Sequence, residues 1–228
     1  MDLNFLETFQ NATPMLLRGL LVTIEISVLS LTIALLLGLI ACLMGMSKYK
    51  PVVWLSKLYI WVMRGTPIMV QAFFLYIGMA QFFRALGYDF RWSSAFMAGT
   101  ITLCLNAGAY IAEIFRGGIQ AIDSGQMEAA RSLGLTKGKA MRKIILPQAF
   151  KICIPSLLNQ FIITIKDTSI ISTIGLAEVM YEGKIYIGMS MNSFATYGLI
   201  ALMYLVIISI LSAITNRVER KMNYGKKS

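Results

Sequence analysis

Long stretches without any ionisable side chain alternate with short polar segments along this chain. The four longest stretches are residues 26–46, 65–83, 92–112 and 185–216. Each is close to or above the ~20 residues that a helix needs to cross a ~30 Å hydrocarbon core. A fifth stretch, residues 152–165, is shorter and is ended by Lys166 and Asp167. The pattern predicts four complete transmembrane helices and a fifth that is interrupted.

With their flanking residues, the predicted spans cover about residues 16–47, 52–83, 93–122, 148–176 and 194–218. The second contains Arg64-Gly65-Thr66-Pro67, which we expect to break the helix and to turn its freed backbone groups toward a cavity. We expect the fourth to break near residues 166–169 and to be followed by a loop. A long polar connection, residues 123–146, joins the third and fourth spans. No repeat or low-complexity segment is visible, so residues 1–228 are predicted to form a single transmembrane domain.

The composition supports a membrane protein over a water-soluble one. Hydrophobic residues make up 57% of the chain, charged residues only 14%, and the mean hydropathy is +0.69. Soluble domains contain about 45–50% apolar residues, and a domain of this size has too little interior to hide the excess. We therefore expect an all-α membrane protein with five transmembrane helices.

The distribution of charge along the chain predicts how it lies in the membrane. The formal net charge is +10. The lysine and arginine residues cluster after the first span, in the connection of residues 123–146 and after the last span, while the alternate loops hold few. This asymmetry follows the positive-inside rule, so we expect an extracellular N-terminus and a cytoplasmic C-terminus. The same asymmetry argues against nucleic acid as the partner of the basic segments, and we expect them to contact membrane lipid instead.

Two further features limit the possible chemistry. The N-terminal flank carries Asp2 and Glu7 and precedes a long apolar run, so we do not expect a cleaved signal peptide. The sequence contains no histidine, and its three cysteines, Cys42, Cys104 and Cys153, all fall in predicted helices, where cysteine behaves as a small hydrophobic residue. A metal site, a redox site or an enzyme active site is therefore not expected.

The polar connection between the third and fourth spans predicts a pair of short helices. Asp123 or Ser124 can cap the first helix, which contains Glu128, and Gly134 suits a left-handed stop. A second, basic helix is expected at about residues 137–145. Such a pair would form a rigid projection that a soluble partner could hold. The alternative is a connector that lies on the membrane surface.

This connection resembles the "EAA" signature of permease subunits of bacterial ATP-binding-cassette importers. The matching residues, at the spacing of that family, are Glu128, Ala129, Ala130, Gly134, Ile144, Leu146 and Pro147. Three other stretches, residues 64–67, 106–119 and 166–169, look like the polar amino-acid permeases of the histidine, arginine and glutamine type. The resemblance covers about residues 13–220 and departs mildly at Ala107, where serine is expected.

The resemblance implies a permease dimer, formed with an identical or homologous second subunit, in the bacterial cytoplasmic membrane. It also implies two cytoplasmic ATPase subunits, an extracellular solute-binding protein and an amino-acid substrate. ATP and magnesium are expected in the ATPase. Within this chain, Gly134–Ala140 has too few residues between its glycines for a phosphate-binding loop and ends in alanine where serine or threonine should hold magnesium. The alternative function is a channel or an ATP-independent secondary transporter.

Ionisable and polar residues inside the predicted spans are the candidates for substrate binding, because such groups are costly in a bilayer and usually face a cavity. They are Glu25, Arg64, Thr66, Asn106, Lys166, Asp167, Thr168 and Ser169. Carboxylates would face a cationic group, and free backbone amides near Ser169 would face the carboxylate of the solute. Structural ion pairs are the alternative. Binding and structural roles are equally open for Asp167 and Glu25, whereas a structural ion pair is favoured for Glu113 and Arg116.

Overall fold

The computed structural model describes residues 5–224, and within that range every regular element is helical. The long elements are α1 (Phe5–Gly45), α2 (Lys50–Gly65), α5 (Ala95–Gln120), α8 (Leu146–Ile171) and α10 (Ser193–Tyr224). The short elements are α3 (Ile68–Phe73), η1 (Phe74–Gly78), α4 (Met79–Ala85), α6 (Ser124–Ser132), α7 (Lys137–Ala140), η2 (Met141–Ile145), η3 (Ser172–Ile174) and α9 (Val179–Ser190). Asp2, which belongs to the N-terminal flank, lies outside the described residues.

In the described part of the chain, five helical stretches are long and apolar enough to cross a membrane. They are Phe5–Gly45, Ile68–Ala85, Ala95–Gln120, Lys137–Ile174 and Ser193–Met222. This confirms the predicted all-α fold with five membrane helices. Much of α10 is exposed, with outward-facing Leu202, Leu205 and Ile210, an apolar surface that suits contact with lipid or with another membrane subunit.

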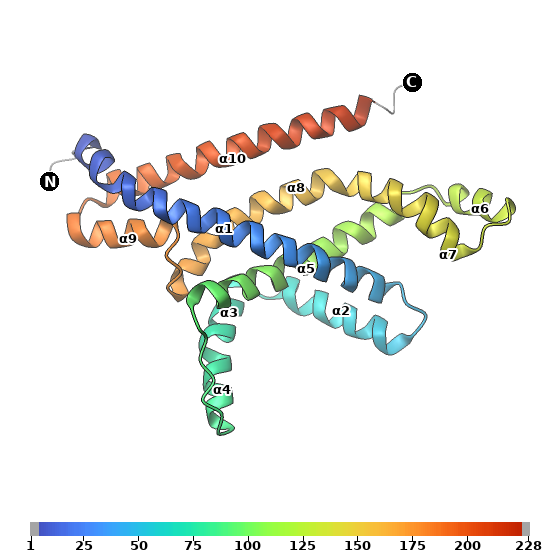
Figure 1. Cartoon of the computed structure of the whole chain (residues 1–228), viewed down its shortest axis with the longest axis horizontal. Coiled ribbons are helices and arrows are strands. Elements are labelled where there is room, and N and C mark those ends of the chain that lie inside the picture. Colours follow the sequence, from blue (N-terminus) through green and yellow to red (C-terminus); the bar gives the residue numbers. More distant parts are fainter. Residues whose placement is uncertain (1–4, 225–228) are drawn as a thin grey trace.

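The centre of the bundle is a close contact between α1 and α5. Gly38 of α1 faces Ile111 and Gly108 of α5, and a Cβ atom added to Gly38 would stand only 2.5 Å from Cγ2 of Ile111. Small residues at such a contact let two backbones approach, which is how helices commonly associate in lipid. Helix α8 packs against both α5 and α1, and α10 lies beside α8 (Figure 1).

The second predicted helix is broken where the sequence indicates. Helix α2 ends at Gly65, Thr66 is extended (φ −121°, ψ 145°), and α3 begins after Pro67. Beyond the break, α3, η1 and α4 run across the direction of α1 and α8 and extend away from the bundle (Figure 1).

The predicted break in the fourth span at residues 166–169 is wrong. Helix α8 continues to Ile171, and the chain leaves it only at η3 and at Gly175, whose φ is +92°. The hydroxyls of Thr168 and Ser169 donate to carbonyl oxygens three residues earlier, at 2.7 and 2.6 Å. Both hydroxyl groups therefore find hydrogen-bond acceptors within their own helix, which does not need to break. Gly175 instead adopts a left-handed conformation that other residues avoid.

The segment expected to be a loop after α8 contains a helix, α9, which packs against α1. Gly19 of α1 lies against the backbone of Glu178, where a Cβ atom would stand 2.8 Å from the carbonyl carbon. The Glu178 side chain is fully buried and accepts hydrogen bonds from the Tyr181 N–H and the Tyr204 hydroxyl, both at 2.8 Å. Burial raises the pKa of the Glu178 carboxyl above its ordinary value, and the hydrogen bonds to it oppose that shift. We call this region, residues 175–192, the outer cap.

Candidate functional site

The break at Pro67 is held open by two buried carboxamides. Pro67 has no N–H, so it cannot donate to the Met63 carbonyl, which loses its normal helical partner. Gln71 Nε2 replaces that partner at 2.8 Å and also donates to the Thr66 carbonyl at 3.0 Å. Asn106 Nδ2 reaches the Met63 carbonyl at 3.3 Å and Gln71 Oε1 at 3.0 Å. The break is therefore a fixed part of the structure, locked from α5.

A cavity of about 340 Å³ lies beside this break, where α5 and α8 meet the start of α3. Its lining residues are Thr66, Pro67, Ile68, Asn106, Tyr110, Gln160, Ile163 and Asp167. The volume falls within the ~300–1,000 Å³ typical of small-molecule sites, and polar groups among apolar walls are typical of such sites. We call it the central cavity. Three of the predicted candidates, Thr66, Asn106 and Asp167, come together there.

Asp167 supplies the negative charge of the central cavity. It is partly buried, and within the described part of the chain its carboxylate makes no hydrogen bond or ion pair. The neighbouring Lys166 is exposed and does not close an ion pair with it. The structural pairing of Lys166 with Asp167, one of the two alternatives, is thus not observed.

Arg64, by contrast, lies in an ion-pair cluster. Its guanidinium is 3.4 Å from Glu113 Oε2 and lies 5.2 Å from the centre of the Tyr110 ring. Glu113 also binds Arg116 through two hydrogen bonds, of 2.9 and 2.6 Å. The favoured interpretation of Glu113 and Arg116 as a structural pair agrees with this geometry, and it extends to Arg64.

The remaining candidates lie elsewhere. Glu25 is exposed on α1 and does not line the central cavity. Thr168 is buried within the helix packing, and Ser169 lies inside α8. The expected free backbone amides near Ser169 are therefore wrong, because α8 is unbroken there.

Two polar lining residues, Tyr110 and Gln160, were not among the predicted candidates, although helical spacing could have found them. Gln160 lies seven residues before Asp167, and Tyr110 lies four residues after Asn106, so each shares a helix face with a predicted candidate. Gln71, which holds the break, shows no such signal because its partner Met63 lies across the break.

The predicted cytoplasmic helix is α6, and its caps are as expected. The Asp123 carboxylate accepts a backbone N–H of the first turn at 2.7 Å. Gly134 has φ +81°, its N–H donates to the Arg131 carbonyl at 3.0 Å, and the Leu135 N–H donates to the Ala130 carbonyl at 3.1 Å. This is the Schellman arrangement that ends helices at glycine.

Some residues of this segment, signature residues among them, are buried inside it, and others lie on its outer surface. Ala130 and Ala140 are buried where α6 meets α7 and η2, whereas Glu128, Ala129 and Leu133 are exposed. Figure 1 shows α6 and α7 at the end of the molecule opposite to α9. The outer face of α6 is therefore available to a partner.

The second predicted helix of the pair, residues 137–145, is not separate. Helix α7 continues through η2 into α8, and the Leu146 N–H donates to the Met141 carbonyl five residues earlier. Ile144 and Leu146 are partly buried along this continuous helix, and Pro147 lies in the first turn of α8, directly after the π-helical segment η2.

Comparison with known proteins agrees with this architecture. The family model described as "Binding-protein-dependent transport system inner membrane component" matches residues 34–224. The chain belongs to this family. It is a multi-pass inner-membrane permease subunit of an importer, and it is not an enzyme. This family membership decides against the alternative of a channel or an ATP-independent transporter.

Several named relatives match over nearly the whole chain. The arginine transport system permease protein ArtQ of Bacillus subtilis is 38% identical over 222 residues, which are 97% of this chain and 98% of ArtQ. The glutamine transport system permease protein GlnP of Escherichia coli K12 is 39% identical over 215 residues, 92% of this chain and 94% of GlnP.

Solved structures show the same fold. A chain from the crystal structure of an amino acid ABC transporter with histidines superposes with a TM-score of 0.90 at 41% identity, over 97% of this chain and all of that one. The methionine transporter MetNI, in an inward-facing conformation, gives a TM-score of 0.71 at 19% identity, over 92% of this chain and 97% of that chain, which supports the fold alone.

Proposed function

We propose that this permease imports polar and above all cationic amino acids, and that the central cavity is where the solute is held within the membrane. The observation that carries the proposal is the Asp167 carboxylate, which lines the cavity without an ion-pair partner among the described residues. The relatives named for arginine and glutamine transport support the substrate class.

The cost of a membrane carboxylate favours this role for Asp167. A charged side chain at the centre of a bilayer costs about 2.5–3.5 kcal/mol on insertion scales. A cationic solute offsets that cost only while it is bound, which suits a transient site. The Tyr110 hydroxyl and the Gln160 carboxamide also line the cavity and can bind the amino and carboxylate groups of the solute.

The exposed face of α6 is the proposed docking surface for a cytoplasmic ATPase. Its ends are fixed by Asp123 and Gly134, so movement of the ATPase would be passed on as movement of a rigid unit. In this proposal two permease subunits enclose the path, a solute-binding protein delivers the amino acid from outside, and ATP with magnesium stays in the ATPase. The N-terminus is outside and the C-terminus is cytoplasmic, as the loop charges predict.

The test is uptake by the complete importer, with its ATPase and binding protein, in proteoliposomes. Arginine, lysine, histidine and glutamine are offered to wild type, Asp167→Asn and Glu25→Gln. We expect Asp167→Asn to lower arginine uptake about ten- to a hundredfold, because a hydrogen bond to a charged group contributes about 1.5–3 kcal/mol. Glu25→Gln, a matched carboxylate outside the cavity, should retain uptake. Unchanged uptake and preference order in Asp167→Asn would contradict the proposed site.

A further inference from the structure

A polar face runs along α8 from the central cavity toward the cytoplasm. Gln160 stands four residues after Ser156 and seven before Asp167, and Asn159 stands three after Ser156, which places all four on one side of the helix. Ser156 and Asn159 are exposed, although they lie in a span that is otherwise largely apolar. Amides and hydroxyls in a membrane helix are costly unless they face water or a polar partner. We therefore expect water or a polar solute to contact this face.

Gln160 joins the central cavity to a second one. This inner cavity has a volume of about 460 Å³ and lies between α8 and the C-terminal part of α10. Its polar lining residues are Ser156, Asn159, Gln160, Thr215, Asn216 and Glu219. Asn159 precedes Asp167 by eight residues, or about 12 Å of helix, in the direction of α6. The inner cavity therefore lies between the central cavity and the cytoplasmic end.

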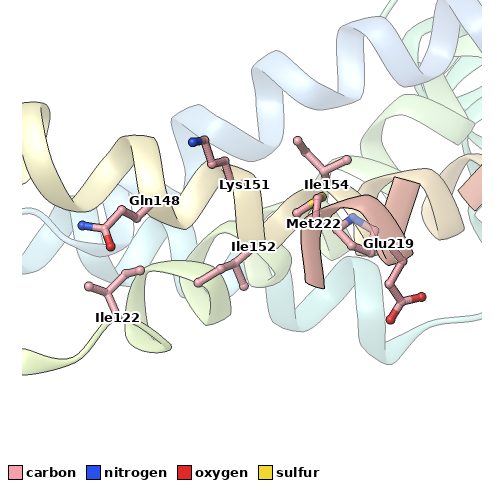
Figure 2. Close-up of a pocket in the computed structure, with 8 residues that line it drawn as sticks. Ile122, Gln148, Lys151, Ile152, Ile154, Glu219 and Met222 are labelled. Atoms are coloured by element: carbon pink, nitrogen blue, oxygen red, sulfur yellow. The ribbon is translucent and has the colours of Figure 1, made fainter. Parts of the chain in front are cut away.

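Glu219 gives the inner cavity a negative charge. It is exposed, and its carboxylate forms no ion pair within the described part of the chain. Glu219 and Pro155 also line a third cavity, of about 760 Å³, which includes Ile122 and Lys151 near the cytoplasmic ends of α5 and α8. In Figure 2 the Lys151 amine and the Glu219 carboxylate point in opposite directions. No ion pair joins Lys151 to Glu219 within the described part of the chain.

We propose that the inner cavity is a second binding site for the cationic end group of the solute, a guanidinium or an ammonium, on its way to the cytoplasm. Glu219 supplies the charge, and the side-chain oxygens of Asn159 and Asn216 accept hydrogen bonds from the solute. The site rests on the proposed function of the central cavity. It provides a countercharge after the solute leaves Asp167 and before it reaches bulk water.

Protection of an introduced cysteine from a soluble maleimide tests the site. Ser156→Cys, and in parallel Thr215→Cys, both in the lining of the inner cavity, are made with Cys42, Cys104 and Cys153 replaced by alanine. The complete importer is placed in inside-out vesicles without ATP, and the maleimide and amino acids are added to the cytoplasmic face. Lys48→Cys, an exposed position in the loop between α1 and α2 that lines none of the three cavities, is the control. Citrulline, a neutral analogue of arginine with a urea group in place of the guanidinium, is the control solute.

We expect arginine at roughly ten times its dissociation constant to slow labelling at both positions about tenfold, since the fraction of unoccupied sites is 1/(1 + [L]/Kd). Citrulline should protect weakly, arginine should not protect Lys48→Cys, and adding Glu219→Gln should remove the arginine protection. Absence of labelling at both positions, or labelling that arginine does not slow, would overturn the inner site. If Asp167→Asn still abolishes uptake in that case, the proposed function stands and only the inner site fails. Absence of amino-acid uptake by wild type would overturn both.

Discussion

The outer cap and the polar face of α8 use acidic residues in opposite ways. In the outer cap, Glu178 is fully buried and accepts hydrogen bonds from Tyr204 and from the backbone of α9. On the face of α8, Asp167 lines a cavity and has no ion-pair partner among the described residues. A carboxylate whose bonds are all made within the chain stabilises the fold, whereas one that is left open is available to a solute.

The largest effect on stability is expected in the outer cap. Glu178→Ala removes the cap of α9 and takes the Glu178 acceptor away from the partly buried Tyr204 hydroxyl. These losses should lower the free energy of unfolding by about 2–4 kcal/mol. The measurement is thermal unfolding of the detergent-purified protein by circular dichroism. Asp167→Asn is the matched control and should unfold at the wild-type temperature; equal destabilisation by both changes would contradict the distinction.

The helix break should be the next most sensitive place. Gln71→Leu removes the donor to the Met63 carbonyl and the acceptor of Asn106. Asn106 keeps its bond to the Met63 carbonyl, whereas the Thr66 carbonyl loses its Gln71 donor; the loss of these buried hydrogen bonds costs about 1–3 kcal/mol, and the central cavity should lose its shape. We expect a lower unfolding temperature together with a higher KM for arginine uptake. Gln81→Leu, an exposed glutamine on α4, is the control, and a wild-type KM in Gln71→Leu would show that the lock is not needed.

A smaller effect is expected at the end of α6. Gly134→Ala forces alanine into a conformation with φ +81°, at a cost of about 1 kcal/mol. Gly138→Ala, where a Cβ atom would meet open space at a φ that is not positive, is the control. We expect Gly134→Ala alone to lower the number of arginine molecules imported per ATP hydrolysed, measured in the same proteoliposomes. An unchanged ratio would argue against α6 as the coupling element.

Much of the fold follows directly from residue chemistry. Proline at position 67 both ends α2 and removes a donor, so the break could be placed from sequence. The caps of α6 were equally predictable, because Asp123 and Gly134 end the helix through groups that lie only a few residues away in the sequence. Features that depend only on local backbone chemistry were thus predictable.

The missed features depend on contacts between distant residues or on weak local signals. Helix α9 was expected to be a loop, because that segment holds Glu178 and other charged residues; its packing against Gly19 of α1 joins residues far apart in the sequence. The pairing of Arg64 with Glu113 joins two different helices, which periodicity within one helix cannot reveal. The break assigned to residues 166–169 failed because hydroxyl side chains can bond to their own helix.

The central claim is that the open carboxylate of Asp167 recognises a positive charge. It is tested most directly by the ratio of kcat/KM for arginine uptake to that for citrulline uptake, in wild type and in Asp167→Asn. Any preference of the binding protein is common to both variants, so a change in the ratio reports on the permease. We predict that the wild-type ratio is about ten- to a hundredfold higher than that of Asp167→Asn, as expected for a lost charged hydrogen bond. Equal ratios in the two proteins would contradict the account.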